Sequence, residues 1–126
     1  MKAPEQLAAF RRAVERLAEA LGRPPDPIVR DSAILRFELA FETAWKCCQT
    51  LTREQGLLAN SPKQALSAAF RLGWITDETL WDEILRLRNT AVHVYHETLA
   101  QALFDRLPAL VPAFRQLLTS LEGHCT

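Results

Sequence analysis

The part of this sequence richest in side chains that can do chemistry runs from Arg88 to His96. Arg88 and His93 are separated by four residues, and Tyr95 lies two positions beyond the histidine. An arginine can hold a phosphate in its planar guanidinium fork, and a histidine can move a proton near neutral pH. These residue types therefore suggest chemistry on a phosphodiester that needs no metal ion.

Cleavage of RNA by its own 2′-hydroxyl group needs a base, an acid and a cation for the charge that develops on phosphorus. A single histidine fills one proton-transfer role at a time. A two-fold dimer with this stretch at its interface would supply two copies of His93 and of Arg88 in one cleft. Asn89 could donate to phosphate or orient the imidazole, and Tyr95 could hydrogen-bond the ligand.

A regular helix does not bring Arg88 and His93 together, because five positions correspond to about 140° around the helix axis. The two side chains can converge where the helix ends or loosens near residues 91–94, or across a dimer. The alternative is a structural role, in which Arg88 pairs with Glu38 or Glu42 and His93 is an interior imidazole.

The histidines and cysteines do not predict a metal site, and we expect neither a metal nor a cofactor. His93 and His96 form an HxxH pair, but two histidines without a third nearby ligand make a weak case. Cys47, Cys48 and Cys125 contain no CxxC spacing and no disulfide framework. We expect at least one of the adjacent pair to be buried and Cys125 to be a tail thiol.

The composition is that of an ordinary globular chain. Its 126 residues, 48% of them hydrophobic, suit one domain over residues 1–126. The formal net charge of zero argues against a general nucleic-acid coat protein, but it allows a local site for one or two phosphates. No apolar run is long enough to span a membrane, and the N-terminus lacks the apolar core of a signal peptide, so we expect a cytoplasmic location.

Apolar residues recur at helical spacing along most of the chain, which predicts an all-α antiparallel bundle of about five helices. Pro24, Pro25 and Pro27 predict a stiff connector. Pro108 and Pro112 interrupt the last helical region, where we prefer one kinked helix to two. We expect helices over 5–21, 31–54, from a Ser61 cap to Gly73, from a Thr76 or Asp77 cap through Arg88, and over 99–121, with fraying from 122 to 126.

The second of these helices carries two stripes. One repeats at spacings of three and four and predicts a core-facing seam; it consists of Ile34, Phe37, Phe41, Ala44, Cys48 and Leu51. The other is a wet stripe that contains Glu38, Glu42 and Trp45. It is either a rim of ion pairs with neighbouring helices or a face that partners the Arg/His stretch or a second subunit.

Residues 30–46, 61–63, 68–75 and 88–95 resemble, block by block, the HEPN superfamily. More narrowly, the chain is similar to the nucleotidyltransferase substrate-binding proteins, or HepT-like toxins, over about residues 5–120. The resemblance implies a HEPN helical bundle and a homodimer in which the R-x4-H-x-Y motifs lie near the dimer cleft.

The resemblance also implies an activity and a partner. Active toxins of this family are metal-independent ribonucleases, and the partner is a minimal nucleotidyltransferase that acts as antitoxin. In related pairs the antitoxin adds AMP to the motif tyrosine. Arg88 and His93 then match the catalytic pair, Asn89 the polar residue after the arginine, and Tyr95 the modified phenol.

Leu87 departs from many relatives, which carry an acidic residue at that position, so Glu38 or Glu42 would have to supply any carboxylate assistance. Two other functions stay open. One is a non-catalytic subunit that holds a nucleotide substrate for a nucleotidyltransferase, which the zero net charge and the wet stripe fit as well. The other is an oligomeric scaffold in which Arg88 is only structural.

Overall fold

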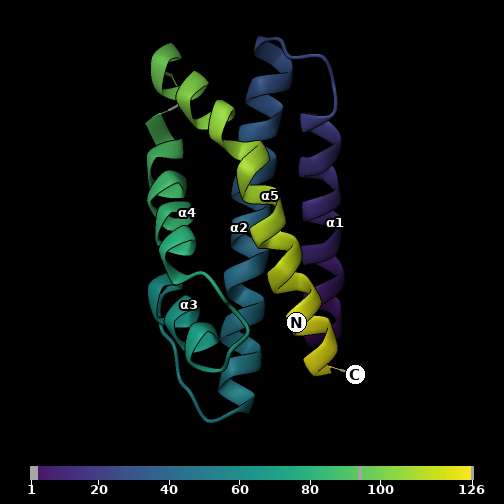
Figure 1. Ribbon diagram of the computed structural model, residues 1–126, viewed down its shortest axis with the longest axis vertical. Helices are drawn as coiled ribbons and strands as arrows, with labels where there is room; N and C mark the ends of the chain where they lie inside the picture. The colour runs from purple at the N-terminus through teal and green to yellow at the C-terminus, as the bar shows by residue number, and fades with distance from the viewer. Residues whose placement is uncertain (1–2, 94, 126) are drawn as a thin grey trace.

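The computed structural model describes residues 3–93 and 95–125, and within these ranges it consists of helices without strands. In Figure 1, α2 lies between α1 and α4, and α5 crosses in front of α2. The predicted all-α bundle is confirmed. The elements are α1 (Ala3–Leu21), α2 (Pro27–Glu54), α3 (Pro62–Arg71), α4 (Glu78–Thr90), the 3-10 helix η1 (Ala91–His93) and α5 (Glu97–Cys125).

The start of α2 lies earlier in the sequence than expected. Asp26 caps the helix by accepting a hydrogen bond of 2.7 Å from the backbone N–H of Val29. Pro27 occupies the first helical position, where its missing N–H loses no helical hydrogen bond. The prediction that Pro27 belongs to a connector was therefore wrong, and the extra turn carries Arg30 into the helix.

Phe114 of α5 lies at the centre of the core. Its ring makes edge contacts with Phe10 of α1, Phe37 of α2 and Trp81 of α4, at centroid separations of 6.4, 6.1 and 5.3 Å. One ring therefore joins four helices, in the edge-to-face arrangement that aromatic quadrupoles favour. All six residues of the predicted α2 seam are buried.

The C-terminal helix is continuous, which confirms the prediction of one helix rather than two around Pro108 and Pro112. It runs on to Cys125, so the expected fraying from residue 122 was wrong for the described residues; Thr126 lies outside them. Side-chain contacts explain the extra turn. Glu122 pairs with Arg11 of α1, and the His124 ring packs on Trp74 with centroids 4.7 Å apart.

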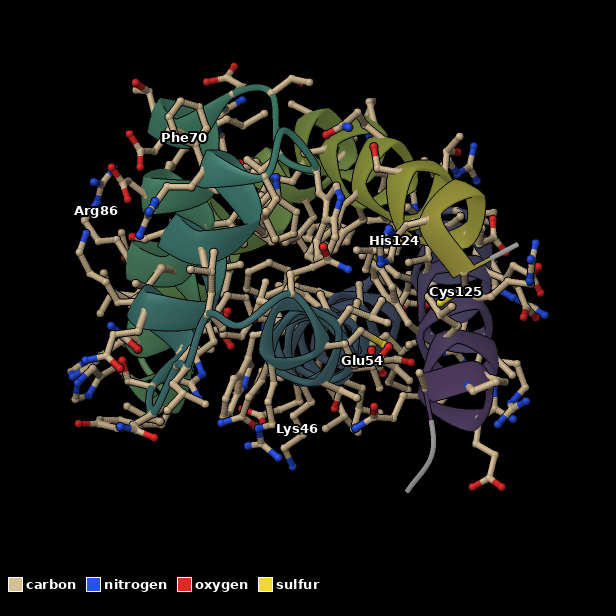
Figure 2. All side chains as sticks on the ribbon, turned by 90° about the horizontal axis from the view of Figure 1, so that it is seen from below. Lys46, Glu54, Phe70, Arg86, His124 and Cys125 are labelled. Atoms are coloured by element: carbon tan, nitrogen blue, oxygen red, sulfur yellow. The ribbon has the colours of Figure 1, made fainter. Side chains whose placement is uncertain are left out.

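Two apolar residues that keep helical spacing with the buried residues of their helices face solvent instead. Phe70 is 40% exposed because α3 packs its alanine-rich side inward, and Figure 2 shows the Phe70 ring pointing away from the bundle. Ala102 on α5 is also exposed.

No helix within the described ranges is long and apolar enough to cross a membrane.

Candidate functional site

Arg88 lies in the last turn of α4 and is held by three groups. Its Nη2 donates to Glu42 Oε1 at 2.7 Å, and its Nη1 donates to Asn89 Oδ1 at 3.1 Å. The guanidinium carbon lies 5.1 Å from the centroid of the Phe41 ring, within cation–π range. The Arg88 side chain is still 30% exposed, so a cation of fixed orientation keeps one side open to a ligand.

Glu42 lies between two cations, because Lys46 Nζ approaches its other oxygen at 3.7 Å. Burial raises the pKa of Glu42, but the hydrogen bond from Arg88, the nearby Trp45 indole and the charges of Arg88 and Lys46 together hold that pKa below its ordinary value. The Trp45 Nε1 is itself buried and makes no hydrogen bond of good geometry in the described chain. The Arg88–Glu42 contact is therefore an ion pair at neutral pH.

The two candidate carboxylates differ in position. Glu42 reaches Arg88, which confirms one of the pairings expected from the sequence. Glu38 is half-buried and makes neither a hydrogen bond nor an ion pair with any described residue. The wet stripe on α2 is thus part ion-pair rim and part unpaired surface.

The α4 helix ends between Arg88 and His93. The Thr90 hydroxyl donates to the Leu87 carbonyl oxygen at 2.8 Å, and the chain continues as the 3-10 helix Ala91–His93. The expected loosening of the helix before His93 is confirmed; Val94, which the same expectation included, lies outside the described residues. Within the described residues of the chain, no hydrogen bond or ion pair joins Arg88 to His93.

His93, Tyr95 and His96 form an exposed ring cluster that begins at the last residue of η1. The His93 and Tyr95 centroids are 6.1 Å apart at 71°, and the Tyr95 and His96 centroids are 4.5 Å apart at 39°. The His96 backbone N–H donates to the His93 carbonyl oxygen at 3.1 Å, which closes the turn. Tyr95 is 74% exposed and is the only tyrosine of the chain. His93 is exposed as well, so the alternative of an interior imidazole was wrong.

An ion pair that the sequence analysis missed fixes the end of this turn. Arg30, which is 7% exposed, donates from Nη1 and Nη2 to the two Glu97 oxygens at 2.8 and 3.2 Å. Its Nε donates to Asp31 at 3.2 Å. The hydrogen bonds of Glu97 and Asp31 raise the Arg30 pKa, and the Arg30 hydrogen bond lowers that of Glu97. The first residue of α5, which follows Tyr95 and His96 in the sequence, is thereby attached to the first turns of α2.

The described residues contain no group of three or more His, Cys, Asp or Glu side chains placed to hold a metal ion. Cys47 and Cys48 are both buried, and burial raises the pKa of Cys47 to about 12 and that of Cys48 further above its ordinary value. Both are therefore protonated packing residues, whereas Cys125, the last residue of α5, is exposed.

The chain is similar to known proteins over most of its length. Residues 5–123 match the family model described as nucleotidyltransferase substrate binding protein like. A solved structure from Thermus thermophilus is 38% identical, with a TM-score of 0.83, and the match covers 89% of this chain and 98% of that one. No curated protein matches the chain.

Two more distant solved structures share the fold. A Haemophilus influenzae protein, described as revealing the fold of a substrate binding domain of a nucleotidyltransferase, is 21% identical, with a TM-score of 0.77 and coverage of 96% and 99%. A tri-AMPylated HEPN toxin of Shewanella oneidensis, solved in complex with an MNT antitoxin, is 20% identical, with a TM-score of 0.79 and coverage of 98% and 99%.

Proposed function

We propose that the chain, which belongs to the family of nucleotidyltransferase substrate-binding-like proteins, is a HepT-like member of the HEPN superfamily and the toxin of a toxin–antitoxin pair. The proposed activity is metal-independent cleavage of RNA, in the cytoplasm, by a chain that acts as one domain over residues 1–126. The observation that carries the proposal is the placement of Arg88, His93 and Tyr95 around the end of α4, with the cation held in position and both rings exposed.

In the proposed reaction, one His93 imidazole accepts the proton of the ribose 2′-hydroxyl, and the 2′-oxygen attacks phosphorus. The bond from phosphorus to the 5′-oxygen breaks, and a second imidazole donates a proton to that oxygen. The products are a 2′,3′-cyclic phosphate and a 5′-hydroxyl. Arg88 stabilises the negative charge that grows on the phosphoryl oxygens. Because one protomer supplies one His93, the proposal requires a two-fold dimer.

The proposed dimer contact combines the outer face of α2 with Val92 of η1. Leu35 and Leu39 are 57% and 48% exposed, and with Glu42 they follow spacings of four and three that place them on one face of the helix. Val92 of η1 is 68% exposed. Large apolar side chains gathered on a surface are typical of protein interfaces, and this surface adjoins the Arg88–Glu42 pair.

The oligomeric state tests this contact. We expect the wild-type chain to sediment as a dimer and Leu35→Glu to sediment as a monomer, because the new carboxylate would be buried without a partner. Leu58→Glu is the matched control, since Leu58 is 77% exposed but lies in the connection between α2 and α3. A wild-type monomer, or equal behaviour of the two variants, would contradict the proposed interface.

The growth of cells that express the chain tests the toxin hypothesis. Expression of the wild-type chain alone should slow growth, and His93→Ala should remove the effect. His124→Ala is the matched control, because His124 is an exposed histidine at the far end of α5. Equal toxicity of the wild type and His93→Ala would rule out a catalytic histidine at this position.

The proposal includes control by a minimal nucleotidyltransferase that adds AMP to Tyr95. The Tyr95 phenol oxygen attacks the α-phosphorus of ATP, the bond to the pyrophosphate group breaks, and the phenol proton passes to a base or to solvent. Tyr95 is exposed and lies beside the rings of His93 and His96, so each added phosphate places negative charge and bulk at the proposed cleft.

Intact-mass measurement tests this modification. Incubation with the cognate nucleotidyltransferase and ATP should add one or more adenylate masses to the wild type and none to Tyr95→Phe. The interpretation is simple because the chain contains one tyrosine. Addition of the same mass to Tyr95→Phe would move the modification to another residue type.

A non-catalytic subunit that presents substrate to a nucleotidyltransferase is the second candidate. The observation that favours it is the Arg88–Glu42 ion pair, which neutralises the cation in a chain of zero net charge. Under this alternative the purified protein forms a stable complex with the nucleotidyltransferase but leaves RNA uncut. Cleavage of RNA in the presence of EDTA, lost in His93→Ala, would exclude it.

A further inference from the structure

A groove between α1 and α2 opens beside the Arg88–Glu42 pair. Its volume is about 320 Å³, and it is lined by Gln6, Ala9, Glu42, Thr43 and Lys46. Glu42 belongs to both places, since it accepts the hydrogen bond from Arg88 and lines the groove. In Figure 2, Lys46 projects from α2 on the side of the bundle away from α5. A ligand that occupies this groove would therefore lie next to the phosphate that Arg88 is placed to hold.

The groove combines a buried acceptor with an accessible cation. The Gln6 Oε1 is buried, and no group of the described chain donates a hydrogen bond to it. A buried polar atom without a partner lowers stability by about 1–3 kcal/mol, so such atoms need an explanation. The Lys46 side chain is 55% exposed, and its contact with Glu42 is a loose 3.7 Å, which leaves the ammonium group able to reach an anion.

We propose that this groove is a subsite for an adenine nucleotide. A glutamine amide pairs in two-point fashion with adenine, because its oxygen accepts from the N6 amino group while its NH2 donates to N7. The unsatisfied Gln6 Oε1 supplies that acceptor, and Lys46 supplies the charge for a phosphate. The groove volume lies at the small end of the range for small-molecule sites.

The inference deepens the proposed function, since it assigns base preference to the same site. A nucleotide in the groove would place its phosphate against the exposed ammonium group of Lys46, on the side of the Glu42 carboxylate away from Arg88. RNA bound in this way would be cut next to adenosine. The preference would come from Gln6 on α1, a residue outside the R-x4-H-x-Y motif.

Direct binding to the full-length protein tests the subsite without any need for catalysis. Calorimetric titrations with AMP, CMP, GMP and UMP should show the tightest binding for AMP. Gln6→Leu should weaken AMP and adenosine alike by about tenfold, the usual effect of losing one hydrogen-bonding group. Lys46→Gln should weaken AMP and leave adenosine unchanged, because adenosine carries no phosphate.

Two further variants test whether a loss of binding comes from the groove. Gln101→Leu is the matched control, because Gln101 is an exposed glutamine on α5 whose amide donates to Asp105. Ala9→Phe should abolish adenosine binding by filling the groove, even if Gln6→Leu folds poorly. Circular dichroism and thermal unfolding establish that each variant is folded before it is titrated.

The outcomes separate the subsite from the proposed function. If AMP binds with the stated dependence on Gln6 and Lys46 but no RNA is cut, the ribonuclease proposal fails and the subsite stands. If the protein cuts RNA but binds the four nucleotides equally, or if Gln6→Leu binds AMP as the wild type does, the subsite is wrong. Absence of AMP binding at millimolar concentration also overturns it.

Discussion

Two aromatic clusters in this molecule have similar ring geometry and opposite exposure. The rings around Phe114 are buried, and its edge contact with Phe37 has a centroid separation of 6.1 Å. His93 and Tyr95 meet at the same separation, but both are exposed. Removal of apolar surface from water provides the main favourable free energy of folding. The buried cluster therefore stabilises the fold, whereas the exposed cluster gains little stability from its position.

Arg88 lies at the boundary between these two regions. Its guanidinium group packs on Phe41, a fully buried ring, while its free edge faces solvent near the end of α4. The cation is thus oriented by the core, and the groups proposed to exchange protons or to be modified are left accessible. Substitutions should separate the two regions: changes in the buried cluster should alter unfolding, and changes at the exposed end should alter chemistry.

The largest expected effect on stability is that of Phe114→Ala. Loss of a fully buried ring that contacts three other aromatic residues should lower the free energy of unfolding by about 3–5 kcal/mol. Urea denaturation followed by circular dichroism measures it. Phe70→Ala is the matched control and should cost far less, because Phe70 is 40% exposed. Equal losses for the two variants would break the distinction between core and surface rings.

Arg88→Ala should act on chemistry instead. We expect RNA cleavage to fall by about 10²–10³, the range for loss of one group that stabilises transition-state charge. The free energy of unfolding should change by no more than about 1 kcal/mol, because the Arg88–Glu42 pair is partly exposed. Arg86→Ala on the exposed side of α4 is the control in a fluorogenic RNA assay. A similar fall in both variants would point to general phosphate attraction, not to a positioned cation.

Glu42→Gln should change how stability depends on pH. The folded pKa of Glu42 lies below its unfolded value, so its stabilising contribution is present above the unfolded pKa and is lost as the pH falls through the folded pKa. The wild type should therefore be more stable at neutral pH, by less than about 1 kcal/mol for this partly exposed pair, and the two proteins should converge in acid. Thermal unfolding between pH 7 and pH 3 measures the difference. A constant offset across that range would mean that Glu42 acts through packing and not through charge.

The smallest expected effect is that of His96→Ala on stability. The ring packs on Tyr95 at a centroid distance of 4.5 Å but is exposed, so the free energy of unfolding should change by no more than about 0.5 kcal/mol. Differential scanning calorimetry is sensitive enough to detect a larger change. A loss comparable with that of Phe114→Ala would show that the exposed cluster supports the fold after all.

The features that could be predicted from the sequence are those that depend on residues close together in the chain. The spacing of three and four along α2 identified its buried seam, because burial follows the helical period. The start of α2 was placed too late, because the proline-rich segment was interpreted as a whole, whereas the Asp26 cap lets Pro27 begin the helix. Phe70 shows a related limit: periodicity gives the apolar face of a helix, but it does not say how much of that face α3 buries.

Contacts between distant segments were beyond such reasoning. Arg30 and Glu97 are 67 positions apart, and neither position carries a local sign of the other. The groove with Gln6 depends on how α1 and α2 pack, which spacing within each helix does not specify. Glu42 was a partial success: two carboxylates were considered for Arg88, and the structure places one of them in contact.

The single, exposed tyrosine has an optical consequence. Trp74 and Trp81 are buried and report on the core, whereas the near-ultraviolet signal of tyrosine in this chain comes from Tyr95 alone. Attachment of a group to the phenol oxygen changes the absorbance of the ring, so the tyrosine band alters with each modified molecule. Docking of a partner over Tyr95 would shift the same band without any label. The residue proposed as the point of control thus also serves as a spectroscopic reporter of its own state.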